Sequence, residues 1–223
     1  MGYKLNFKVS TMGKFRFITL WILLILSIFN TFGQGDNSKP TRHEEGVIIN
    51  GIRWATCNVG KPGVFAAKPE DPGMFYQWNR KIGWSTTDPK INSNGGSSWS
   101  SGVPAGNTWE KANDPSPAGW RVPTLDEFRT LLDTDKVRNE WVTQNGVNGI
   151  KFTCKSSHNS IFLPVAGSRG FSSGAISNTK TGCYWSSTPY GSYEAYSFYF
   201  GDGNASRLNG YRSGGRLVRC IAE

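Results

Sequence analysis

The strongest local signal in the sequence is a helix start within GWRVPTLDEFRTLLDTD, Gly119 to Asp135. Thr124 precedes Glu127 by three residues, the spacing of a capping box in which each side chain bonds the other residue's backbone amide. Apolar residues then recur at helical spacing, so the segment predicts one amphipathic helix. Asp126 and Glu127 lie where the helix dipole favours negative charge, so we interpret them as helix-start residues and not as a general acid–base pair.

Most of the remaining chain is typical of strands separated by Gly- and Asn-rich turns. Apolar residues alternate around Asn50-Gly51 and Asn145-Gly146, dipeptides that two-residue hairpin turns prefer. A third turn is expected at His158-Asn159, and a second short helix is an option near residues 136–143. One helix, or two, in a chain otherwise rich in strands predicts the α+β class.

A long segment without a regular pattern covers residues 81–117. Loops of this length in compact domains are either functional or disordered. Trp84, Trp99 and Trp109 argue against disorder, because disordered segments are poor in aromatic residues. We therefore expect an irregular loop that is pinned to the domain.

The first 33 residues have the pattern of a secretory signal peptide. Basic residues precede an apolar run from Phe17 to Phe29, and small residues flank a cut after Gly33. The run is shorter than the roughly 20 residues of a membrane-spanning helix, although an uncleaved anchor is the alternative. Residues 34–45 are then a flexible leader and residues 46–223 a single domain. We expect an exported protein, extracellular or at the cell surface, with the periplasm as another option.

Charge and composition narrow the classes of partner. Removing residues 1–33 removes four basic residues and no acid, so the net charge falls from +9 to +5. No Lys/Arg cluster is present to follow a phosphate backbone, which argues against nucleic acid as a partner. The two histidines, His43 and His158, complete no recognisable metal site, and no cofactor is expected. We expect no membrane span in the mature chain.

Four cysteines occur in the chain, Cys57, Cys154, Cys183 and Cys220. An even number of cysteines in an exported protein favours disulfides, and four cysteines allow three pairings. Buried thiols are the alternative, because a domain of this size does not need bridges to remain folded.

Eight ordered blocks, which together span essentially all of residues 46–223, resemble the Fibrobacter succinogenes major paralogous domain, a family common in exported proteins of gut Bacteroidetes. The blocks are WATCNVG, GMFYQWN, GWRVPTLDEF, TQNGVNGIKF, SIFLPVAGSRG, CYWSST, AYSFYF and GRLVRCI. RVPTLDEF also resembles a block of the sulfatase-modifying-factor family, which has a C-type-lectin-like fold. The resemblance implies that fold: a twisted antiparallel sheet with one or two helices and long loops, and the two ends of the domain on neighbouring strands. It further implies a Cys57–Cys220 bridge, which leaves Cys154–Cys183 as the second pair.

The enzymatic and calcium-binding branches of that fold carry motifs that this sequence lacks. The formylglycine-generating branch needs a close pair of cysteines in one loop, whereas Cys183 and Cys220 are far apart in sequence. No Gly-x-Ser-x-Gly nucleophile elbow occurs, and the motifs of calcium-dependent sugar binding are absent. The sequence therefore predicts a protein without catalysis.

The C-terminal stretch from Gly182 to Gly215 is rich in Tyr, Ser, Gly and Asn, the composition of antibody paratopes. Strand alternation in AYSFYF places Tyr196, Phe198 and Phe200 in the core and directs Ser197 and Tyr199 outward. Ordinary solvated surface is the alternative for the outward residues. The candidate ligand-binding residues are Tyr193, Glu194, Ser197, Tyr199, Asp202, Asn204, Arg207, Asn209 and Tyr211.

The sequence thus predicts an exported, non-catalytic protein that binds a glycan or protein ligand through its C-terminal loops. The same stretch has the composition expected of a target of a diversity-generating retroelement, which rewrites Asn codons in some lectin-like proteins. A structural module of the cell surface or of a surface appendage is the main alternative. An enzyme of the sulfatase-modifying type is a more distant one.

Overall fold

The computed structural model describes Gly2, residues 46–201 and residues 204–223 of the 223-residue chain. The expected signal peptide, the leader and the candidate residue Asp202 lie outside the described residues. Within the described part, no helix is both long and apolar enough to cross a bilayer.

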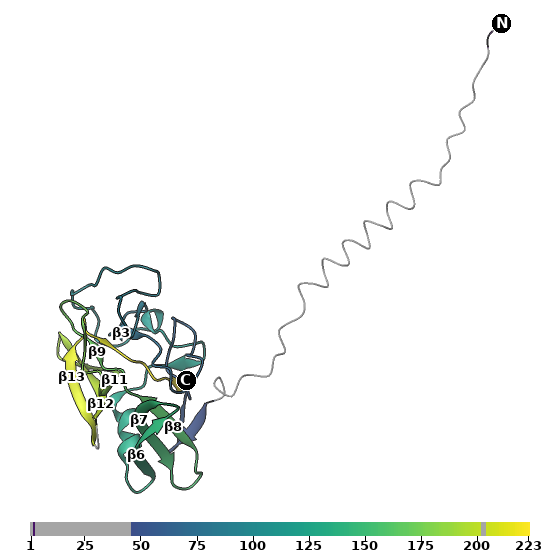
Figure 1. Cartoon of the computed structure of the whole chain (residues 1–223), viewed down its shortest axis with the longest axis vertical. Helices are drawn as coiled ribbons and strands as arrows, with labels where there is room; N and C mark the ends of the chain where they lie inside the picture. Colours follow the sequence, from purple (N-terminus) through teal and green to yellow (C-terminus); the bar gives the residue numbers. More distant parts are fainter. Residues whose placement is uncertain (1, 3–45, 202–203) are drawn as a thin grey trace. The chain divides into compact units, whose positions relative to one another are not determined.

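The described residues form four antiparallel sheets and one short α-helix, which confirms the α+β class (Figure 1). The first sheet contains, in spatial order, β1 (Val47–Ile49), β2 (Ile52–Trp54), β15 (Ile221–Ala222) and β5 (Trp120–Arg121). The second contains β10 (Ile176–Ser177), β9 (Ser168–Arg169), β14 (Gly215–Arg216), β3 (Phe75–Gln77) and β4 (Gly83–Trp84). The third contains β11 (Gly182–Tyr190), β12 (Glu194–Gly201) and β13 (Asn204–Tyr211). The fourth contains β6 (Val137–Gln144), β7 (Val147–Cys154) and β8 (Ser160–Pro164).

The helix α3 (Leu125–Arg129) begins with the predicted capping box and continues into a 3₁₀ turn, η2 (Thr130–Leu132). The Glu127 amide donates to Thr124 Oγ1 at 3.2 Å, and the Thr124 amide donates to Glu127 Oε2 at 2.7 Å. Burial acts to raise the pKa of Glu127, but hydrogen bonds from Arg121 and Thr124 outweigh it and lower the pKa. These bonds confirm Glu127 as a helix-start residue.

The predicted hairpin turns are present, but the second helix is wrong. Asn50, Asn145 and His158 all have positive φ, as the predicted turns require. Residues 136–143 lie mostly in β6, which pairs with β7 along its whole length. The Asn145 turn folds the two strands together, so cross-strand pairing overrides the weak local preference for helix.

The two ends of the domain lie on neighbouring strands, as the resemblance implied. Ile221 of β15 lies opposite Trp54 of β2, and the Ala55 amide donates to the Cys220 carbonyl at 2.9 Å. A short 3₁₀ turn, η1 (Lys111–Asn113), is the remaining helical element of the described chain.

The expected disulfides are not formed: all four cysteines are buried thiols. The register places Cys220 opposite Ala55, so Cys57 lies two residues further along the ladder although the strands adjoin. Cys154 ends β7 and Cys183 lies opposite Tyr199 in a different sheet. Sequence order and neighbouring strands alone did not determine which side chains face one another.

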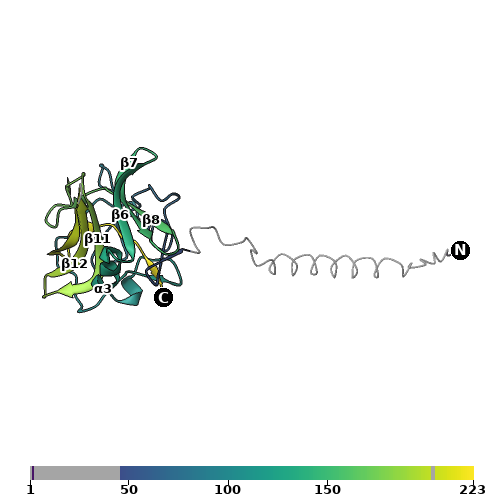
Figure 2. The same ribbon diagram turned by 90° about the horizontal axis from the view of Figure 1, so that it is seen from below.

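Strands β11 and β12 separate two hydrophobic clusters. Tyr184, Phe198 and Phe200 contribute to one cluster, together with Phe128 of α3, whose ring stacks on Phe198 at 5.0 Å. Figure 2 shows α3 beside these two strands. Trp185 and Ala195 contribute to the other cluster, which also contains Tyr76, Trp78, Trp109 and Val218. Both faces of the two strands are therefore covered over part of their length.

The irregular segment at residues 81–117 is pinned, as expected. The buried Arg169 side chain donates to the Ser85 and Thr87 carbonyls, at 2.8 Å each. Trp99 packs on Trp84 with ring centroids 4.9 Å apart, and its indole N–H donates to the Phe171 carbonyl. These contacts tie the loop to the β9–β10 region.

Candidate functional site

The most distinctive exposed feature is a group of aromatic and polar side chains at one end of the β11–β12–β13 sheet. In the antiparallel register Tyr190 lies opposite Glu194, and Glu194 lies opposite Tyr211, so the three share one row and one face. Tyr196 and Asn209 form the next row along. We call this group, with Tyr193 of the β11–β12 turn and Phe171, the polar–aromatic surface.

Four of its five aromatic rings pack in pairs, and all but the half-buried Tyr196 are exposed. The rings of Tyr190 and Tyr196 are 5.0 Å apart, and those of Phe171 and Tyr211 are 4.3 Å apart. Tyr193 is 65% exposed and Tyr211 46% exposed. Because each paired ring restrains its neighbour, the surface offers broad apolar area that loses little freedom when a ligand binds.

Glu194 and Asn209 provide hydrogen-bonding groups between the rings. Asn209 Nδ2 donates to Glu194 Oε2 at 2.6 Å, which fixes both side chains. Among the described residues, Oε1 of Glu194 and the side-chain Oδ1 of Asn209 have no hydrogen-bond partner. The pair can therefore accept hydrogen bonds from a ligand while its own orientation is held.

The buried Arg212 side chain forms hydrogen bonds to the backbone at this end of the sheet. Its guanidinium donates to the carbonyl oxygens of Gly106 at 2.6 Å, Gly191 at 2.9 Å and Glu194 at 3.1 Å. It also lies over the Trp78 ring, 4.2 Å from the centroid. Burial lowers the pKa of Arg212. One side chain thus joins the β11–β12 turn, the start of β12 and the long loop into a single support.

In a comparison with known protein families, the family described as the Lcl C-terminal domain matches residues 49–222 of the chain. The chain belongs to the Lcl C-terminal domain family. The match spans nearly the whole described domain. Membership of the Fibrobacter succinogenes paralogous family is not confirmed. No curated protein and no solved structure is significantly similar to the chain.

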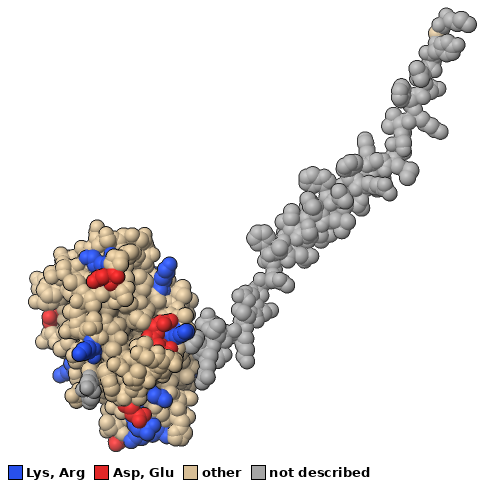
Figure 3. Space-filling model, in the orientation of Figure 1, with Lys and Arg blue, Asp and Glu red and all other residues tan. Residues whose placement is uncertain are grey.

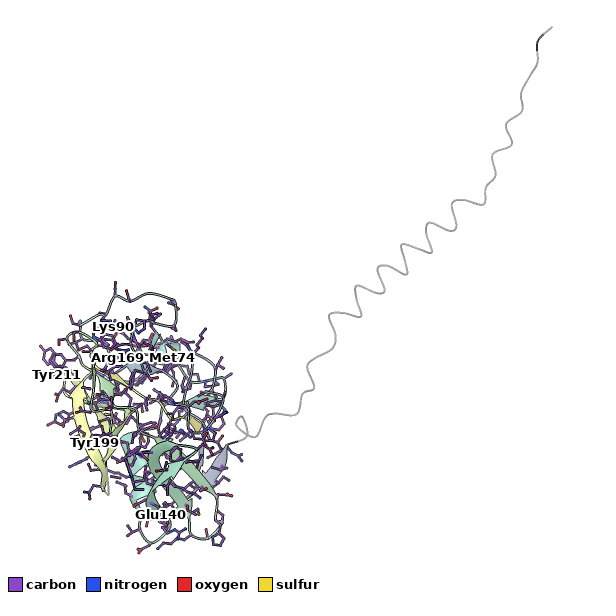
Figure 4. The ribbon with its side chains drawn as sticks, in the orientation of Figure 1. Met74, Lys90, Glu140, Arg169, Tyr199 and Tyr211 are labelled. Atoms are coloured by element: carbon purple, nitrogen blue, oxygen red, sulfur yellow. The ribbon has the colours of Figure 1, made fainter. Side chains whose placement is uncertain are left out.

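Several predicted site residues of this Lcl C-terminal domain are in the polar–aromatic surface, and others are not. Tyr193, Glu194, Asn209 and Tyr211 come together there. Tyr199 lies opposite Ser206, toward the other end of the sheet, and Figure 4 shows it well apart from Tyr211. Asn204 and Arg207 are exposed on β13 but lie in rows beyond the surface.

Ser197 was predicted to face outward and is wholly buried, so that prediction is wrong. Its hydroxyl donates to the Leu208 carbonyl at 3.0 Å and accepts a hydrogen bond from Arg216. Arg216 in turn lies over the Trp185 ring, 4.2 Å from its centroid. The second hydrophobic cluster covers this face of β12, which alternation within one strand could not indicate.

Three members of the polar–aromatic surface were not predicted. Tyr196 was assigned to the core, but it is only half-buried because the core ends at Phe198. Tyr190 lies in the C-terminal stretch that starts at Gly182, and only the strand register places it opposite Glu194. Phe171 comes from the β9–β10 loop, and no local pattern connects it to Tyr211.

The charges agree with a surface that is not specialised for polyanions. On the face shown in Figure 3, Lys and Arg are scattered among Asp and Glu and do not gather into a stripe. Glu194 is the one charged side chain of the polar–aromatic surface. Among the residues described, no three His, Cys, Asp or Glu side chains are grouped as metal ligands would be.

A separate pocket of about 490 Å³ lies beside Cys154. Hydrogen bonds from Ser156, from Ser157 and from the backbone amides of Asn50 and Ser157 lower the pKa of Cys154 to about 6. These hydrogen bonds stabilise the thiolate form of Cys154 relative to its thiol form. Cys154 belongs to the β6–β7–β8 sheet, whereas the polar–aromatic surface belongs mainly to the β11–β12–β13 sheet.

Proposed function

We propose that this Lcl C-terminal domain is an exported, non-catalytic binding protein that recognises a glycan or protein ligand through its polar–aromatic surface. One observation carries the proposal: exposed rings and a fixed Glu194–Asn209 pair stand side by side on a support held by Arg212. Exposed aromatic rings offer large apolar area that can pack on apolar protein side chains or on the apolar face of a sugar. The carboxylate and amide oxygens would accept hydrogen bonds from sugar hydroxyls or from peptide amides.

The C-type-lectin-like fold, the relation to the Fibrobacter paralogous family and export through residues 1–33 belong to the same proposal. Adjacent first and last strands and a single short capped helix support the fold assignment. Extracellular or cell-surface location, with the periplasm as the alternative, follows from the N-terminal sequence pattern.

Targeting by a diversity-generating retroelement is a further part of this proposal. All eight residues of β13 are exposed or half-buried, so changes at most of these positions would alter the surface and leave the core intact. The test is genomic: a near-copy of the DNA that encodes residues 184–219 should lie beside a reverse transcriptase gene. Absence of both rejects this part and leaves the binding function untouched.

A structural role in the cell surface or in an appendage is the second candidate. The observation that favours it is the long exposed edge strand β13, which is suited to pairing with another chain. A structural module would bind no glycan or soluble ligand.

A binding survey separates the two candidates. The protein should be applied to a glycan array and used as bait with extracts of the native microbial community. Tyr193→Ala and Tyr211→Ala should each weaken binding at least about tenfold, the loss of one good aromatic contact, with an unchanged melting temperature. Tyr199→Ala is the matched control and should bind normally. Equal loss for all three tyrosine variants, or no ligand in either survey, would reject the proposal.

A further inference from the structure

Strand β13 is an uncovered edge of the three-stranded sheet. It pairs with β12 along all eight of its residues, and no other strand of the described residues lies along its other side. In the described part of the chain, the backbone of Asn204–Gly210 receives hydrogen bonds from β12 alone. Figure 1 shows β13 at the outside of the domain, with β12 and β11 behind it.

Most of the devices that usually protect an edge strand are absent from β13. Natural edge strands are shortened, bulged, or guarded by Pro and by charged side chains, especially Lys. β13 contains neither Lys nor Pro, its one charged residue is Arg207, and its ladder with β12 has no register shift, whereas the β11–β12 ladder does. Leu208 at the middle of the strand is 45% exposed. Such an edge is a template for a further strand.

We propose that this strand is a β13 of a second copy of the chain, added antiparallel across a two-fold axis at Leu208. A two-fold axis perpendicular to the sheet keeps each face on its own side, so the two Leu208 side chains meet at the centre. Each exposed leucine would then lose its contact with water. The two-fold arrangement also closes, which limits growth to a dimer.

The hydrogen-bond directions agree with this register. In an antiparallel ladder, the backbone groups of successive residues point alternately toward and away from a given neighbour. Because Ser197 Oγ reaches the Leu208 carbonyl, Leu208 points its backbone groups toward β12. Those of Arg207 and Asn209 therefore point outward, where the register would pair Arg207 with Asn209 of the partner subunit.

Charge complementarity supports this register and disfavours one of its two neighbours. Within each chain, the Asn209 side chain is hydrogen-bonded to Glu194. Glu194 of the partner subunit would therefore lie next to Asn209 of the partner subunit, on the side that Arg207 faces. Arg207 is exposed and long enough to reach a diagonal carboxylate. A shift by one step in one direction would place the two Arg207 side chains opposite each other, which like-charge repulsion disfavours.

The remaining pairs bring small residues opposite large ones. Ala205 would face Tyr211 of the partner subunit, and Ser206 would face Gly210. The dimer would join two three-stranded sheets into one and place both polar–aromatic surfaces on the same face. This inference does not depend on the proposed ligand.

A cross-linking experiment tests the register. Directly opposite residues in an antiparallel pair lie about 4.5–5.5 Å apart at Cα, within the range of a disulfide. Leu208→Cys should give a covalent dimer under mild oxidation. Ser206→Cys, which is also exposed but would lie opposite Gly210 of the partner subunit, is the control and should remain monomeric in denaturing gels. Cross-linking of both variants at equal rates, or of neither, would overturn the proposal.

Sedimentation of the unmodified protein and of charge variants gives an independent test. The protein should shift from monomer to dimer between low micromolar and submillimolar concentration. Arg207→Glu should abolish dimerisation with its melting temperature unchanged, and Arg207→Glu with Glu194→Arg should restore it. Lys61→Glu, an exposed charge change elsewhere, should have no effect. A protein that remains monomeric throughout, or a trimer, would contradict the dimer and favour an edge reserved for another protein.

Discussion

Individual buried arginines connect distant segments of this domain, a role that the number of basic residues in the sequence does not indicate. Arg169, Arg212, Arg216 and Arg219 are all at least nine-tenths buried. Arg212 and Arg219 donate to carbonyl oxygens from separate segments of the chain, and Arg212 and Arg216 also cover tryptophan rings. A guanidinium has five donors in a fixed plane, so one side chain can satisfy several loop carbonyls at once. In the sequence these residues look like surface charge.

Arg212→Lys is expected to destabilise the fold although the charge is kept. Lysine cannot reach the Gly106, Gly191 and Glu194 carbonyls together, so buried acceptors lose their partners. The free energy of unfolding, measured in urea, should fall by about 2–3 kcal/mol. Arg80→Lys, at a less buried arginine, should change it by no more than about 0.5 kcal/mol. Equal effects of the two substitutions would show that the Arg212 contacts do not support the domain.

Cys154 should be the thiol most easily alkylated at neutral pH. Its pKa is lowered to about 6 by the Ser156 hydroxyl and its neighbours, whereas burial raises the pKa of Cys57 and of Cys220. Iodoacetamide labelling of the native protein, followed by peptide mass spectrometry, should show a rate for Cys154 that rises to half its plateau near pH 6. Ser156→Ala should move that midpoint upward. A midpoint near the ordinary value for cysteine would contradict the assignment.

At the scale of elements, the features that depend on neighbouring residues could be predicted and those that depend on distant strands could not. Residues close together in the sequence determine the Thr124–Glu127 capping box and the turns at Asn50 and Asn145, and each of these is present. The helix predicted near residues 136–143 is absent because pairing with β7 determines the conformation of β6. The outward orientation predicted for Ser197 was wrong because hydrophobic clusters cover both faces of β12, each over part of its length.

Ser197→Ala tests the corrected position of this side chain. The substitution removes the acceptor of a buried Arg216 N–H and the donor to the Leu208 carbonyl. The free energy of unfolding should fall by about 1–3 kcal/mol, since a buried donor is left without a partner. Ser206→Ala, on the exposed neighbouring strand, should change it by less than about 0.5 kcal/mol. A neutral Ser197→Ala would restore the outward orientation that alternation predicted.

At the scale of the molecule, sequence patterns predicted an α+β domain with a pinned long loop, and the family resemblance implied its adjacent ends. About half of the candidate site was also predicted, since Tyr193, Glu194, Asn209 and Tyr211 gather as one surface. Phe171 was missed because only the folded chain brings its loop to Tyr211. The disulfides were wrong because strand register, and not strand adjacency, determines which cysteines face each other.

Footprinting of aromatic side chains tests the position of the binding surface most directly. The protein should be oxidised by hydroxyl radicals with and without the glycan or protein that binds best in the survey, and the modified residues measured by mass spectrometry. We predict protection of Tyr190, Tyr193 and Tyr211 together with Phe171, while Tyr199 reacts equally in both samples. Protection of Tyr199 with unchanged reactivity of Tyr193 and Tyr211 would place the ligand elsewhere and contradict the account.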